Sequence, residues 1–204
     1  MHRRTVALLA STVVVGAGLP LLAASPAEAI QAPVAFSSVA ASTYQTNGIA
    51  WAVASAQGKV FVGGSFTSVR PAGSAAGTNE TARSNFVTLD PATGAPTSFA
   101  PAFTLRGSAS TATIRALDVS PDGNTLYIGG SFSSAGGKAK QYLAAMDIAS
   151  CTIISAFTPL PNATVRAIKS TATAVYYGGD VLSVGGTART YAAAAVAVGQ
   201  SGAG

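Results

Sequence analysis

The chain has 204 residues and a formal net charge of +5, with 49% hydrophobic and only 9% charged residues. Disordered chains are charged and poor in apolar residues, so this composition excludes an intrinsically disordered protein. The basic residues are scattered and form no dense basic stripe, and nucleic acid is therefore not an expected partner.

The N-terminus has the parts of a secretory signal peptide. Two arginines near the start form a short positive region, and an apolar region follows over residues 6–24. Ala27 and Ala29 then fit the small-x-small pattern of a cleavage site. We predict that residues 1–29 are removed and that the mature chain is secreted or extracellular, with cell-wall association possible and no membrane span. The glycines and the proline in the apolar region disfavour the alternative, an uncleaved membrane anchor.

A seven-residue motif with two glycines occurs three times. It reads VFVGGSF from Val60, LYIGGSF from Leu126 and VYYGGDV from Val175. An apolar run lies before each copy and another lies after it, and in the first two repeats a weaker fourth element ends in Phe-x-Pro. These runs are short, rich in β-branched or aromatic residues and bounded by turn residues, so we predict that they are strands.

The repeats occupy residues 49–101, 114–159 and 165–198, and the third holds three of the four elements. Four strands in a unit of about 45 to 50 residues are typical of a β-propeller blade. The predicted fold class is therefore all-β, with about three four-stranded blades in an incomplete propeller. A β-solenoid or a β-sandwich is the alternative fold.

The predicted number of blades leaves the closure of the propeller open. Residues 33–36, within the N-terminal segment 30–48, resemble a fourth strand that could complete the third repeat. Closed propellers have roughly four to eight blades, so three would leave exposed sheet edges. Either the chain is a truncated gene product, which the tail 199–204 favours, or two copies close a six-bladed ring as a symmetric dimer.

The second repeat resembles the bacterial delta-sixty repeat. The resemblance rests on residues 119–132, VSPDGNTLYIGGSF, and on residues 143–147, LAAMD, and it extends over about residues 49–198. The third repeat departs from the pattern at Asp180 and Val181, which stand in place of serine and phenylalanine. This family consists of β-propeller repeats that are common in secreted actinobacterial proteins, often beside adhesion or carbohydrate-binding modules. The resemblance implies a fold and a compartment but no reaction.

Few residues are suited to catalysis or metal binding. The single histidine, His2, lies in the predicted signal peptide, and Cys151 is the only cysteine. Ser-His-Asp and Cys-His catalysis, an internal disulfide and zinc sites built from histidine or cysteine are therefore excluded from the mature chain. We expect no catalytic residue, no cofactor and no metal site. Cys151 is either a small turn residue or the partner of a cysteine outside this chain.

Candidate binding residues lie in a long loop and at equivalent positions of the repeats. The loop 70–83 is the longest insertion, and such loops often carry binding. Its polar candidates are Arg70, Asn79, Glu80 and Arg83. Arg115 and Arg166 are repeat-equivalent, and with Asp180 they are assigned either to a ring around a central channel or to contacts between blades. Ile49 is expected to take their place in the first repeat. Asp90 and Asp147 are also repeat-equivalent, and they are expected to cap turns.

The expected function is that of a secreted binding or scaffold module whose ligand is an extracellular glycan or protein. One alternative is a propeller-class enzyme that cleaves glycans or depends on a quinone. Glycan cleavage would need Glu80 and Asp180 to converge on one sugar bond, since glycosidases use paired carboxylates. The other alternative is a nonfunctional truncated remnant.

Overall fold

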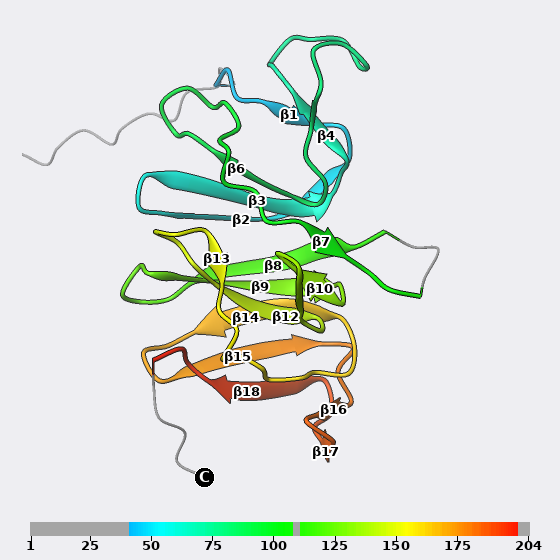
Figure 1. Cartoon of the computed structure of the whole chain (residues 1–204), viewed down its shortest axis with the longest axis vertical. Coiled ribbons are helices and arrows are strands. Elements are labelled where there is room, and N and C mark those ends of the chain that lie inside the picture. The colour runs from blue at the N-terminus through cyan, green and yellow to red at the C-terminus, as the bar shows by residue number, and fades with distance from the viewer. Residues whose placement is uncertain (1–40, 108–110, 200–204) are drawn as a thin grey trace, which may run out of the picture. The chain divides into compact units, whose positions relative to one another are not determined.

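A computed structural model describes residues 41–107 and 111–199 of the chain (Figure 1). All regular secondary structure in these ranges is β, which confirms the predicted all-β class. Within the same ranges there is no helix of a length and apolarity that would cross a membrane. The predicted signal peptide, the predicted strand at 33–36 and residues 200–204 of the tail lie outside the described residues.

Three antiparallel main sheets correspond to the three repeats. The strands of the first sheet are, in spatial order, β2 (Ile49–Ala56), β3 (Lys59–Ser65) and β6 (Phe86–Leu89). Those of the second are β8 (Thr113–Val119), β9 (Thr125–Ser131), β12 (Leu143–Asp147) and β13 (Thr152–Ile153). Those of the third are β14 (Val165–Ser170), β15 (Ala174–Gly179) and β18 (Ala192–Val196).

A smaller sheet accompanies each main sheet. The first of them joins β1 (Gln45–Thr46), β4 (Ser68–Arg70) and β5 (Thr81–Ala82). The second joins β7 (Phe103–Thr104), β10 (Ser134–Ala135) and β11 (Lys138–Ala139). The third is the hairpin of β16 (Ser183–Val184) and β17 (Thr187–Ala188), which is extended by a single bridge between Pro161 and Val184. These smaller sheets were not predicted from the sequence.

The predicted fourth strands differ from those in the structure. In the second sheet the fourth strand is β13, which ends before Phe157, and in the first sheet only a bridge between Leu89 and Pro96 remains. The Phe-x-Pro segments themselves are not strands. Their rings pack inward instead, with Phe99 5.9 Å from Phe61 and Phe157 5.4 Å from Tyr127 between ring centroids. The aromatic residues that suggested a strand thus fill the core.

Buried apolar side chains lie between consecutive main sheets. The layer between the first and second sheets includes Phe61, Phe86, Ile114, Leu126 and Ile128. The layer between the second and third sheets includes Tyr127, Leu143, Val165, Val175 and Tyr177. Strand β9 contributes to both layers, because successive side chains of a strand point to opposite faces of the sheet.

The first glycine of each of the first two motifs lies where the next sheet packs. A Cβ atom added to Gly63 would collide with the side chain of Ile114 in β8. A Cβ atom added to Gly129 would lie 2.6 Å from Cγ1 of Val165 in β14, far inside van der Waals contact. The branched side chains of one sheet therefore occupy the space that the glycines of the preceding sheet leave empty.

We expect Gly63→Ala to destabilise the protein by about 1–3 kcal/mol, because it overpacks the contact with Ile114. The same substitution should cost less in an Ile114→Ala background, where the space is free. Its cost should be unchanged in a Val175→Ala background, because Val175 belongs to the other buried layer. Urea unfolding of the six proteins in these two mutant cycles measures the coupling. Equal costs in all three backgrounds would contradict the packing described here.

Candidate functional site

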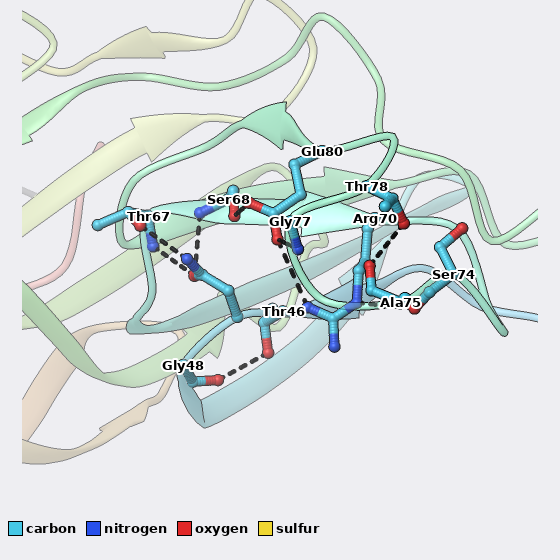
Figure 2. A network of polar contacts seen from close by, with 11 residues as sticks. Thr46, Gly48, Thr67, Ser68, Arg70, Ser74, Ala75, Gly77, Thr78 and Glu80 are labelled. Atoms are coloured by element: carbon cyan, nitrogen blue, oxygen red, sulfur yellow. Dashed lines mark hydrogen bonds and ion pairs between the residues drawn. The ribbon is translucent and has the colours of Figure 1, made fainter.

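The loop 70–83 is organised around Glu80 (Figure 2). The Ser68 hydroxyl donates to Oε2 of Glu80 over 2.6 Å, and the Gly77 amide donates to Oε1 over 3.0 Å. Nη1 of Arg70 lies 3.7 Å from Oε1, and Nε of Arg70 donates to the carbonyl oxygen of Ser74. Glu80 thus connects β4 to the turn of its own loop.

These contacts stabilise the charged form of Glu80. The hydrogen bond from Ser68 is the main cause that lowers the pKa of the carboxyl group below its ordinary value, with the Gly77 amide next and Arg70 a smaller contribution. Arg83 lies apart from this cluster and donates to the carbonyl oxygens of Ala82 and Thr97.

Asn79 has a positive φ of 54° and so serves the turn. Arg70, Asn79, Glu80 and Arg83 therefore all have a place in the architecture of the loop or of its connections.

A β-bulge occurs at the same place in the first strand of each main sheet. The register shifts between Ala50 and Ala52 in β2, between Ile114 and Ala116 in β8, and between Val165 and Ala167 in β14. The inserted residues are Trp51, Arg115 and Arg166. Opposite each bulge lies the second glycine of a motif, where an added Cβ atom would collide with a backbone carbonyl oxygen of the bulged strand or of the residue preceding it.

The inserted residues and Asp180 form a group of charged and aromatic side chains that we call the bulge row. The Arg115 guanidinium lies 4.8 Å from the centroid of the Trp51 ring, a cation–π contact between the first and second sheets. Arg166 makes two hydrogen bonds to Asp180, of 2.9 and 2.7 Å, within the third sheet. Both partners of this ion pair are about half exposed, and Trp51 is 46% exposed.

Electrostatic effects connect the two halves of the bulge row. The hydrogen bond from Arg166 is the main cause that lowers the pKa of Asp180, and the positive charge of Arg115 lowers it further. Arg115 therefore acts on Asp180 as well as on Trp51. The row presents two guanidinium groups, one carboxylate and one indole ring at the surface.

Trp51 is the member of the row that the sequence analysis missed. Ile49 was expected at this position, but the register pairs Ile49 with Ser65 and leaves Trp51 unpaired in the bulge. A bulge inserts one residue and shifts side chains to the other face, which an alignment of apolar runs does not reveal. Trp51 lies twelve residues before Gly63 in the sequence, close to the fourteen residues that separate Arg115 from Gly129. This spacing could have identified Trp51 from the sequence.

The six carboxylates of the described ranges all have partners. Asp90 and Asp147 accept hydrogen bonds from backbone amides of the turns that follow them, as expected from their equivalent positions. Asp122 accepts from the hydroxyl of Ser120 in a similar turn. Asp118 of β8 accepts from Ser170 and Lys169 of β14 and so connects the second and third sheets. With Glu80 and Asp180, these groups hold neighbouring segments together.

Cys151 occupies the turn position that Gly94 has in the first repeat. Both residues have a positive φ, of 60° and 67°, and the pKa of the partly buried Cys151 thiol is raised by burial. Nearby, Nζ of Lys140 is buried and donates to the carbonyl oxygens of Ser155 and Phe157. Burial is the main cause that lowers the pKa of Lys140. This lysine fixes the segment after β13, a role that its sequence context did not suggest.

Within residues 41–107 and 111–199, no group of three or more His, Cys, Asp or Glu side chains is placed to hold a metal ion. No protein-family model matches the chain, and no curated protein matches it. The resemblance of the second repeat to the delta-sixty repeat therefore stays a prediction. Ala27 and Ala29 of the predicted cleavage site lie outside the described residues.

The Gly77 amide should report the ionisation of Glu80. Because the pKa of Glu80 lies below 4.5 in the folded chain, its stabilising effect is present above about pH 4.5 and is lost as the pH falls through the lower folded value. We expect the proton shift of the Gly77 amide in NMR spectra to titrate with a midpoint below 4.5. The Gly73 amide in the same loop serves as the control, and Glu80→Gln should abolish the transition. A midpoint at or above 4.5 would show that the cluster is not formed.

Proposed function

We propose that this chain is a secreted, non-catalytic module of β-propeller repeats that binds acidic glycans of a cell surface through the bulge row. The three main sheets would be blades, and the bulged strands would present one residue each toward the ligand. The observation that carries the proposal is the contact between Trp51, which is 46% exposed, and the partly exposed Arg115, whose charge also acts on Asp180 of the Arg166–Asp180 pair.

The side chains of the row suit a sugar that carries a carboxylate. An indole ring offers a flat apolar face on which the apolar side of a sugar ring can stack. A guanidinium group binds a carboxylate through two parallel hydrogen bonds. Arg115 stacks on Trp51 and forms no ion pair with any described residue, whereas Arg166 is engaged by Asp180. The positive net charge of the chain would add a weaker, non-specific attraction to an anionic polymer.

The other carboxylates support a binding role rather than hydrolysis. A glycosidase needs one carboxylic acid and one carboxylate that are free to act on the sugar bond. In the described ranges Glu80, Asp118 and Asp180 are each held by hydrogen bonds to neighbouring segments. The pKa values of Glu80 and Asp180 are lowered, which is opposite to the shift that a general acid needs.

Trp51 is the only tryptophan of the chain, so its fluorescence reports directly on the proposed site. We expect a saturable change in this fluorescence when polygalacturonate is added at low salt, and no change with neutral dextran. Added salt should weaken the binding, because exposed charges are screened. A fluorescence that polygalacturonate leaves unchanged would contradict the proposal.

Variants separate the specific contact from general charge attraction. Arg115→Gln should lower the affinity for polygalacturonate by about tenfold, equivalent to about 1.4 kcal/mol. Arg106→Gln removes the same charge from an exposed position outside the bulge row and should have little effect. Calorimetry should show a comparable loss for Trp51→Ala, which removes the fluorescent group. If Arg106→Gln and Arg115→Gln lowered the affinity equally, the binding would depend on net charge alone, which would contradict the proposed site.

A further inference from the structure

Exposed large apolar side chains concentrate on the first and last main sheets. Ile49, Trp51 and Val53 lie on β2 and are 54%, 46% and 63% exposed. At the other end of the described chain, Tyr176 of β15 and Val196 of β18 are 54% and 44% exposed. Of these residues, Val53, Tyr176 and Val196 lie on the sheet faces that point away from the buried layers, and an apolar face of this kind needs a second layer to cover it.

The two contacts between the main sheets show what such a cover looks like. Phe61 of β3 is fully buried in the layer that also contains Ile114 and Leu117 of β8. Tyr127 of β9 is equally buried in the layer that contains Val165 and Ile168 of β14. In both contacts an aromatic ring and a glycine of one sheet receive branched side chains from the first strand of the next.

The third sheet carries the same receiving face with nothing packed on it. Tyr176 stands where Phe61 and Tyr127 stand in the other sheets, and Gly178 corresponds to Gly63 and Gly129. A Cβ atom added to Gly178 would meet no side chain within 4 Å, only a backbone oxygen of Tyr191. A shallow depression lies over this face, and its lining includes Lys169, Tyr176, Gly178, Ala192 and Ala194.

The first sheet carries the matching inserting face. Counted from the bulge, Ala50 and Val53 of β2 correspond to Ile114 and Leu117 of β8 and to the equivalent pair in β14. Ala50 and Val53 are both exposed, whereas Ile114 is fully buried and Leu117 is partly buried. One chain therefore has a receiving face on β15 and β18 and an inserting face on β2, and both are uncovered within the described residues.

We propose that a second copy of this chain covers both faces: β2 of each copy packs on β15 and β18 of the other. A second copy is the occupant because the same pair of faces already meets twice within one chain. Two copies that pair in this manner about a two-fold axis bury all four faces in one dimer. The bulge row lies on other side chains of β2, so the proposal does not depend on the proposed ligand.

Light scattering after size exclusion tests the proposal with the full chain. The unmodified chain should have twice the mass of a single chain. Val53→Asp alters only the inserting face, whereas Tyr176→Lys alters only the receiving face. Each variant by itself should be monomeric. When the two variants are mixed, one contact joins an aspartate to a lysine and the other keeps both native residues. The mixture should therefore recover the doubled mass as a one-to-one complex.

Other results would overturn the proposal. An unmodified chain that is monomeric at all concentrations would show that the faces stay exposed or are covered by another segment of the polypeptide. A dimer that Tyr176→Lys disrupts and Val53→Asp preserves would show that two receiving faces meet each other. Leu182→Asp, on an exposed side chain outside both faces, is the control for charge and should keep the doubled mass. Circular dichroism identifies variants that fail to fold, and Val53→Ser and Tyr176→Ser then replace them.

Discussion

The close approach of consecutive sheets at the paired glycines is the constraint on which the rest of the structure depends. The first glycine has no side chain, so a branched residue of the next sheet can occupy the space beside it, as Ile114 does at Gly63. The second glycine lets the backbone of the bulged strand approach closely, as at Gly130 and Thr113. One dipeptide therefore sets both the packing between sheets and the position of the bulge, and the bulge decides which side chain reaches the surface.

Polar side chains in this protein mostly hold segments together, and the bulge row differs from them. Asp118 ties two sheets together, Lys140 fixes a connecting segment, and Glu80 organises a long loop. The hydrogen bonds of each of these groups join segments of the chain to one another. Trp51 packs on Arg115 but remains 46% exposed, and Arg115 is partly exposed, so both side chains can be reached from solvent. The proposed binding function follows from this division between engaged and accessible groups.

The repeats explain why apolar faces are exposed at the two ends of the described chain. Each internal sheet contact joins a receiving face to an inserting face, so any finite series leaves one of each kind uncovered. In the second sheet both faces are buried, and Tyr127 and Ile114 are almost inaccessible to solvent. In the third sheet the equivalent ring of Tyr176 is exposed. Self-association through such faces is a property of repeat architecture rather than of any individual residue.

The amino-acid sequence by itself determined the all-β class, the three repeats, the turns at Asp90 and Asp147, and the exclusion of histidine chemistry from the described chain. These features depend on local patterns of apolar and turn residues, which a linear reading can detect. Tertiary structure alone decided that Trp51 joins Arg115, that the Phe-x-Pro rings enter the core, and that Glu80 belongs to a loop cluster. The reason is physical: a one-residue bulge changes the face of a side chain, and contacts between distant strands have no signature along the chain.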